Sequence, residues 1–330
     1  MLLRIFKYNT TAGYLLIPLL AVIAWLPSLT SDTYIEMFFD RSPMPLYEIL
    51  AGHIPHDSLT SKIIALMLVL MAGFYLIRLN NTYLFLPERT LLPAFFLILI
   101  ISSLPPLQRL HPGLVAMVFF LPAVERLLAS YKTERLSYNF FEASFLIGTG
   151  SLFYFNLIWL NIMVWAALLI LRPVIWREWV FSILGLAAPW FFLLATDFIL
   201  HDSIQWSTEM VSVNFAIRNL LNFLLLPDRI FLSLLLLLII MASRKIMHSM
   251  TKMKVLSRKI FLLMFWVFAI TMVTCIFVEN ANVELLVFAA VPVAFLFSHF
   301  ILSMRKVFWG NAILWGVVAG MLILTWFPWR

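Results

Sequence analysis

Apolar runs of about 20 residues recur along the whole chain, and they restrict the fold more than any other feature. A helix needs about 20 mostly apolar residues to cross the hydrocarbon core of a bilayer, where only helices or closed barrels satisfy their own backbone hydrogen bonds. The runs are too long for barrel strands and lack the alternation of apolar and polar residues that such strands show. The chain is 63% hydrophobic and 12% charged, whereas a soluble domain is about one half apolar and one quarter charged. We therefore expect an all-α, polytopic transmembrane bundle.

The apolar runs predict eleven transmembrane helices. They cover residues 12–29, 62–79, 89–105, 112–128, 139–155, 156–172, 178–200, 229–243, 259–278, 284–303 and 308–328. No interval between them is long and polar enough for a separate soluble domain, so residues 1–330 are expected to form one integral membrane domain. Three connections stand out: an acidic loop with an interfacial helix at 30–61, an amphipathic loop at 201–228 and a basic loop at 243–259. The segment "GTGSLFYFN" (148–156) is either a tight turn or a re-entrant piece.

The distribution of charge predicts the orientation of the bundle. With the N-terminus in the cytoplasm, 17 of the 23 basic residues fall in cytoplasmic segments and 11 of the 16 acidic residues fall outside. This pattern follows the positive-inside rule, and it makes "RPVIWRE" (172–178) a cytoplasmic turn with Arg and Trp anchors at the interface. The basic run at 244–259 is then a juxtamembrane segment that faces anionic lipid. We expect membrane lipids as partners and no nucleic acid, in spite of the net charge of +7.

The sequence lacks the motifs of several enzyme classes. Its single cysteine, Cys275, excludes an intramolecular disulfide and a cysteine-based metal site. The segment "GHIPHD" offers His53, His56 and Asp57 as metal ligands, but Pro55 keeps the two histidines off a regular helical face. There is no Gly-rich phosphate loop, no H-E-x-x-H and no G-x-S-x-G. We therefore expect neither a bound metal nor a cofactor.

The first external loop holds the candidate catalytic residues. Asp32, Glu36 and Asp40 are spaced i, i+4 and i+8, which places three carboxylates on one face of a helix. Such a helix would lie at the outer surface with its apolar side toward the lipid. Carboxylates in this position can activate an acceptor hydroxyl or hold a metal that is bound to a lipid phosphate. The alternative interpretation is a solvated acidic face on an external loop.

Arginines are scarce on the predicted external side, which makes them candidate ligands for a lipid phosphate. Apart from the terminal residue they are Arg41, Arg109, Arg218 and Arg229. A guanidinium binds phosphate through two parallel hydrogen bonds, and a lipid-linked substrate would present its pyrophosphate at this level. The alternative is that these arginines pair with Asp40, with Asp228 or with lipid headgroups.

The middle of the chain resembles a known family. The segments "ERTLLPAFFLILIISSLPP", "ASFLIGTGSLFYFN" and "LILRPVIWREWVFSILGLAAPWFF" are similar to an uncharacterised family of bacterial multi-pass inner-membrane proteins, and "RPxxWREW" is the most specific part. The resemblance covers roughly residues 70 to 195. It implies a multi-pass protein of the bacterial inner membrane, and it carries over no catalytic residue.

A looser similarity of layout points to polyprenol-linked membrane glycosyltransferases and glycan polymerases. These proteins also have about eleven spans and an acidic first external loop with surface helices. The similarity implies that Asp32, Glu36 or Asp40 is the acceptor base or a metal ligand, and that Arg218 or Arg109 binds the lipid pyrophosphate. We therefore expect a cell-envelope protein that acts on a lipid-linked glycan at the outer face. The alternatives are a non-enzymatic subunit of an envelope assembly or secretion complex, with an envelope protein as partner, and a small-molecule or lipid transporter.

Overall fold

A computed structural model describes residues 2–30, 43–54, 58–131, 138–201, 211–212, 226–278, 283–304 and 306–326. Within these residues it holds thirteen α-helices: α1 (Leu2–Lys7), α2 (Thr11–Thr30), α4 (Pro45–Ala51), α5 (Leu59–Tyr83), α6 (Leu92–Ser102), α7 (Pro112–Ala129), α8 (Asn139–Ser151), α9 (Asn161–Leu171), α10 (Trp176–His201), α12 (Leu226–Ser249), α13 (Val255–Phe277), α14 (Leu286–Leu302) and α15 (Val307–Trp326). Short 3-10 helices in the same residues are η1 (Pro105–Leu107), η2 (Phe155–Leu160), η4 (Met250–Lys252) and η5 (Val283–Leu285). The described residues contain no strand, and the expected all-α fold is confirmed.

Seven of the described helices are long and apolar enough to span a membrane. They are α2, α5, α7, α10, α12, α13 and α15, and three further apolar segments are shorter: α6, η2 with α9, and α14. Each of the eleven predicted helices overlaps one observed helix. These lengths and compositions are those of a multi-pass membrane protein.

The helix α6 is shorter than predicted, and prolines explain its limits. It covers Leu92–Ser102 instead of 89–105. Pro93 stands in its first turn, where a missing backbone N–H costs no hydrogen bond. At the other end Leu104 precedes Pro105 and has extended backbone (φ −108°, ψ 100°), the conformation that a residue before proline prefers.

The structure also defines two other connections, of which the first is the tight turn that was one of the two alternatives and the second differs from the sequence pattern. The helix α8 ends at Ser151, so the segment 148–156 completes this helix and then turns tightly into η2. The basic segment 243–259, predicted as a loop, is mostly helical: α12 continues into it and α13 begins within it, on either side of η4. Lysine and arginine are good helix formers, so a basic composition alone does not end a helix.

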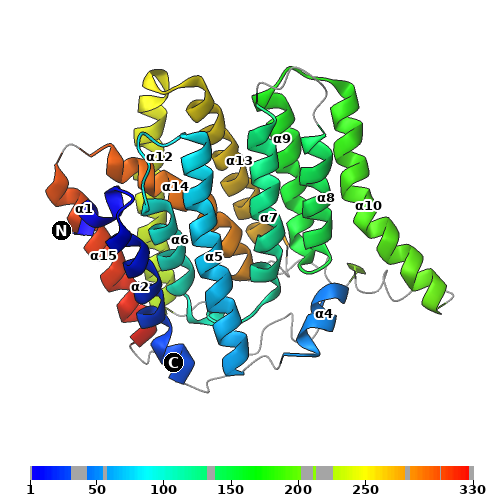
Figure 1. Cartoon of the computed structure of the whole chain (residues 1–330), viewed down its shortest axis with the longest axis horizontal. Coiled ribbons are helices and arrows are strands. Elements are labelled where there is room, and N and C mark those ends of the chain that lie inside the picture. Colours follow the sequence, from blue (N-terminus) through cyan, green and yellow to red (C-terminus); the bar gives the residue numbers. More distant parts are fainter. Residues whose placement is uncertain are drawn as a thin grey trace.

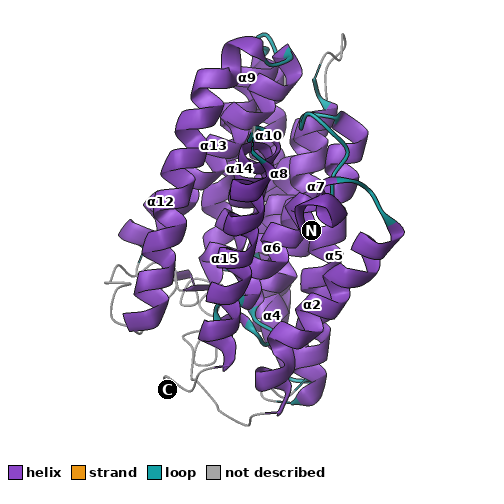
Figure 2. Cartoon of the chain, turned by 90° about the vertical axis from the view of Figure 1, so that its left-hand side faces the viewer, coloured by secondary structure: helices purple, strands orange, loops and turns teal. Residues whose placement is uncertain are grey.

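The helices α6 and α14 form the centre of the bundle. Every residue of α6 is buried, as are residues 287–301 of α14. The rings of Phe96 and Phe297 join the two helices, with centroids 5.4 Å apart, and Figure 2 shows both helices between the outer ones. In contrast, α10 and α12 bury few of their residues inside the protein. Helices that are apolar all round and little covered by protein require an apolar solvent.

Glycines allow α8 and α10 to approach closely. A Cβ atom on Gly185 would lie 2.4 Å from the backbone oxygen of Phe141, and one on Gly148 would lie 2.9 Å from that of Leu186. Small residues at such positions let helix backbones touch, as at many helix contacts in membranes. Figure 1 shows α10 beside α8 and then diverging from the bundle toward its C-terminal end.

The bundle has two ends, which we name by what lies there. At the α4 end, α2 finishes, α5 begins, α6 turns into α7 and α8 turns into η2. At the opposite end, α5 finishes and α9 turns into α10 (Figure 1).

Candidate functional site

The turn between α6 and α7 is buried at the α4 end and is held by α2. Trp25 in α2 donates from Nε1 to the hydroxyl of Ser102 over 2.8 Å. Gln108 donates from Nε2 to the backbone oxygen of Ser102 (2.6 Å), and its own backbone oxygen accepts from the hydroxyl of Ser28 (3.3 Å). Buried polar groups are almost always paired in this way, so the turn has a fixed conformation.

Two further helices fix the residue at the centre of the site, Leu110. Its backbone N–H donates to the hydroxyl of Ser61 in α5 (3.2 Å), and its backbone oxygen accepts from the hydroxyl of Tyr47 in α4 (3.1 Å). The side chains of Arg109 and His111 flank this residue on both sides. Their positions are therefore set by three helices rather than by a mobile loop.

Two cationic side chains are buried at this end. Arg109 is 7% exposed, as is Lys62 in the first turn of α5. Lys62 follows Ser61, which binds the backbone beside Arg109. Burial of a charged group costs free energy unless other groups compensate it, so both cations depend on the groups that pack around them.

His111 lies two residues after Arg109, and the sequence analysis did not single it out. It is 1% exposed, and neither ring nitrogen has a hydrogen-bond partner among the described residues. Burial and the nearby Arg109 charge lower the pKa of His111 to about 3, so the imidazole is neutral near pH 7. A neutral, buried imidazole offers one N–H donor and one acceptor nitrogen, and a buried group without partners is a candidate for binding a ligand.

The other wall of the site comes from η5 and the α8–η2 turn. Glu284 is 1% exposed and Tyr154 is 6% exposed. A Cβ atom on Gly113 would lie 3.0 Å from the backbone oxygen of Glu284 and 3.2 Å from the ring of His111, so glycine lets these groups meet. Burial, and then the Glu284 charge, raise the pKa of Tyr154 well above its usual value. Tyr154 therefore stays a neutral hydroxyl that can donate or accept.

We call Lys62, Arg109, His111, Tyr154 and Glu284 the turn cluster. The short helix α4 (Pro45–Ala51) contacts the turns that hold two parts of this cluster. The backbone N–H of Leu46 donates to Leu152 in the α8–η2 turn (3.3 Å), while Tyr47 reaches the α6–α7 turn. In this way α4 bridges two turns at one end of the bundle (Figure 1).

The structure describes few of the predicted site residues. Asp32, Glu36, Asp40, Arg41 and Arg218 lie outside the described residues, and Arg229 lies in α12 but its side chain is not described. Their roles stay predictions. Arg109 alone has a described side chain, and the structure places it in the turn cluster.

Sequence reasoning missed four members of the turn cluster: Lys62, His111, Tyr154 and Glu284. The available signal was "QRLHPG", three polar side chains directly before the proline that opens an apolar helix. No metal site is found in the described part of the chain. His53 is exposed there and contacts the backbone oxygen of Ile49 (2.8 Å), while the other two residues of "GHIPHD" singled out earlier are not described.

At the opposite end, the "RPVIWREW" segment forms a structural turn. Arg172 at the end of α9 pairs with Glu178 in the first turn of α10, with Nη1 and Oε1 2.7 Å apart. The Arg172 and Glu178 side chains are 4% and 0% exposed. Trp179 packs against Trp165 of α9 with ring centroids 6.5 Å apart. The motif therefore joins two helices.

Comparison with known proteins gives a family but no activity. No curated protein and no solved structure matches the chain. A family of unknown function, DUF6427, matches residues 47–328. The match confirms the expected membership of an uncharacterised family and extends it on both sides of residues 70–195. Because it spans most of the chain, including the turn cluster and the "RPVIWREW" turn, the protein belongs to the DUF6427 family.

Proposed function

We propose that this protein is a multi-pass protein of the bacterial inner membrane, with its N-terminus in the cytoplasm, that acts on a lipid-linked glycan. In this proposal the turn cluster faces the outer side and binds the phosphate or pyrophosphate group of a polyprenyl-linked sugar. The observation that carries it is the pair formed by Arg109, a buried cation, and His111, a buried imidazole whose ring nitrogens have no partner in the described residues.

Charge supports this orientation. The opposite end of the bundle carries the exposed basic residues Arg78, Arg89, Arg126 and Arg177, as the positive-inside rule expects of a cytoplasmic face. The predicted catalytic carboxylates belong to the segment that leads directly into α4. Since α4 is hydrogen-bonded to the two turns beside the turn cluster, the chain leads from these acids toward the proposed phosphate site.

Three members of the turn cluster, Lys62, Arg109 and His111, have side chains that suit a phosphate group. Arg109 offers two parallel donors to phosphate oxygens, and Lys62 offers a point charge. A base with a pKa near 3 is too weak to remove a proton from a sugar hydroxyl at neutral pH. The role of His111 is therefore to orient the phosphate through its N–H, and a bound anion would raise its pKa again.

In glycosyl transfer, the turn cluster then stabilises the leaving group and a carboxylate of the first external loop acts as the base. The acceptor hydroxyl oxygen forms a bond to the anomeric carbon, and the bond from that carbon to the phosphate oxygen breaks. The pyrophosphate leaves with the electron pair beside Arg109, and a carboxylate among Asp32, Glu36 and Asp40 takes the hydroxyl proton.

Gentle purification from native membranes, followed by mass spectrometry of proteins and lipids, tests the proposal. We expect a polyprenyl-linked sugar to co-purify with the wild-type protein and to be lost from Arg109→Gln and His111→Phe. The control is Arg126→Gln, which removes an arginine from the opposite end. A stoichiometric protein partner without such a lipid would refute the enzyme and assign the protein to an envelope assembly.

Two further experiments test the reaction and the orientation. The variants Asp32→Ala, Glu36→Ala and Asp40→Ala should lower surface glycan at normal protein levels, and wild-type glycan in all three would exclude glycosyl transfer.

The orientation is tested by labelling of single cysteines. In a background with Cys275→Ser, a cysteine placed at residue 205 should react with an impermeant reagent on intact spheroplasts, and one at residue 250 should not. The reverse labelling pattern would exclude the proposed orientation.

A further inference from the structure

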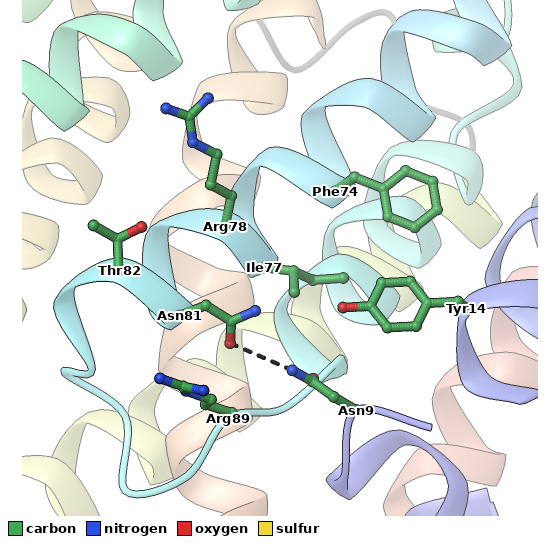
Figure 3. Close-up of a pocket in the computed structure, with 8 residues that line it drawn as sticks. All are labelled: Asn9, Tyr14, Phe74, Ile77, Arg78, Asn81, Thr82 and Arg89. Carbon is green, nitrogen blue, oxygen red and sulfur yellow. Dashed lines mark hydrogen bonds between the residues drawn. The ribbon is translucent and has the colours of Figure 1, made fainter. Parts of the chain in front are cut away.

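A second polar site lies at the opposite end of the bundle. It is a pocket of about 420 Å³ between the start of α2, the last turns of α5 and the loop from α5 to α6. Figure 3 shows Asn9 and Tyr14 from the start of the chain opposite Asn81 of α5, with Arg89 beside them. Because α5 rises about 1.5 Å per residue, the pocket lies on the order of 20 Å from the turn cluster along this helix.

Among the residues that the structure describes, the lining of this pocket carries positive charge and no carboxylate. Its two charged lining residues are Arg78 and Arg89. Arg78 is partly compensated by Glu125, with Nη2 and Oε1 3.3 Å apart. Glu88, next to Arg89 in sequence, instead pairs with Lys7 over 3.4 Å. Arg89 has no ion pair with any described residue and is exposed, so its guanidinium can receive an anion.

The backbone around Arg89 is fixed on both sides. Asn80 donates from Nδ2 to the backbone oxygen of Glu88 (3.0 Å). On the other side, Thr90 donates from its hydroxyl to the backbone oxygen of Phe6 (2.9 Å), and the N–H of Leu91 donates to the same oxygen (3.0 Å). A guanidinium on an anchored backbone loses less freedom when it binds a ligand.

The remaining lining is suited to a ligand with polar and apolar parts. The amides of Asn9 and Asn81 approach each other at 3.5 Å, which is long for a hydrogen bond, so both can turn to a ligand oxygen. Tyr14 stacks on Phe74 with ring centroids 6.2 Å apart. Aromatic rings at this level are typical of the membrane interface, where lipid headgroups meet the hydrocarbon.

We propose that this pocket binds the phosphate headgroup of an anionic phospholipid. Arg89 binds the phosphodiester oxygens, the two asparagine amides bind glycerol hydroxyls, and the Tyr14–Phe74 pair packs against the glycerol backbone and the first methylenes. Basic pockets between helices are a known form of headgroup recognition. The site is independent of the turn cluster and of the function proposed for it.

Native mass spectrometry of the full-length protein in detergent, titrated with phosphatidylglycerol, tests this site. The variant Arg89→Gln removes the charge and keeps much of the side-chain length. Its matched control is Arg177→Gln, because Arg177 is an exposed arginine at the same end but outside the pocket. We expect Arg89→Gln to weaken the tightest phosphatidylglycerol site about tenfold, as loss of one charge-assisted contact predicts, and the control to bind like the wild type.

Two comparisons identify the source of the phosphate. Phosphatidylcholine should bind more weakly than phosphatidylglycerol, and glycerol 3-phosphate or inorganic phosphate should not compete at equal concentration. Wild-type affinity of Arg89→Gln for phosphatidylglycerol would overturn the site. Competition by inorganic phosphate as strong as by the lipid would overturn the lipid assignment and leave a free anion as the ligand.

Discussion

Replacing Glu178 by glutamine removes the carboxylate that Arg172 faces inside the protein. The two side chains are 0% and 4% exposed, and their atoms are 2.7 Å apart. Loss of one partner of a buried ion pair costs about 3 to 5 kcal/mol, because the other charge stays buried without it. Glu178 also lies in the first turn of α10, where a negative charge adds about 0.3 to 1 kcal/mol through the helix dipole.

This loss should be visible as a lower melting temperature. One kcal/mol shifts Tm by about 2 to 4 °C in domains of 150 to 250 residues and by less in longer chains. For this chain of 330 residues we expect Glu178→Gln to lower Tm by roughly 6 to 10 °C. The assay is thermal unfolding of the purified protein in mild detergent, followed by size-exclusion chromatography with fluorescence detection.

A double variant and a control make the test specific. Arg172→Leu with Glu178→Leu removes both charges and should cost less than either single change, because neither of these two charges then stays buried without the other. The control is Glu142→Gln, since Glu142 pairs with Arg126 on the surface, where the two side chains are 44% and 52% exposed. Surface pairs contribute little. A Tm of Glu178→Gln within 2 °C of the control would refute the reasoning.

Three other perturbations have defined outcomes. Gly185→Ala places a Cβ atom 2.4 Å from a backbone oxygen of α8 and should destabilise the protein, whereas Gly316→Ala, which meets nothing within 4 Å, should not; both are compared by Tm. His111 binds its proton in the unfolded chain near pH 6.5 but in the folded protein only near pH 3, so stability is full above pH 6.5 and falls as pH drops toward 3. The fall from this group is up to about 1.4 kcal/mol per pH unit, and the slope of Tm against pH should flatten in His111→Gln but not in His53→Gln. Asn80→Ala removes one partly buried hydrogen bond, to Glu88 O, and one buried hydrogen bond, from Leu86 N, and should lower stability by about 2 to 4 kcal/mol in the same assay.

The apolar runs predicted where the helices lie, because length and hydropathy are properties of each segment alone. Helix limits were less accurate at α6, because hydropathy alone does not mark the ends that Pro93 and Pro105 set. The segment "RPVIWRE" was interpreted from the sequence as a turn with Arg and Trp anchors at the interface, and the structure adds that Arg172 and Glu178 form a buried ion pair. Nothing in the sequence states that two such residues face inward.

Less of the candidate site than of the fold could be predicted from the sequence. Arg109 was selected because arginines are scarce on the predicted external side, and that reasoning found one member of the turn cluster. His111 was missed because its burial results from α2, α4, α5 and η5 meeting around one turn. No local pattern in a single sequence shows that these elements pack around the same turn. A histidine directly before the first proline of an apolar helix is nevertheless a signal worth following.

The central position of α6 and α14 has a consequence for biosynthesis. The helix α6 ends at Ser102 and α14 ends at Leu302, so 200 residues of chain separate two helices that pack together in the core. At about 5 to 20 residues per second, the ribosome needs roughly 10 to 40 s to deliver the second after the first. During that interval lipid, earlier helices of the same chain or a chaperone must cover the face of α6 that α14 later occupies. The order of synthesis, rather than the stability of the finished bundle, therefore sets how long the nascent protein is open to misassembly.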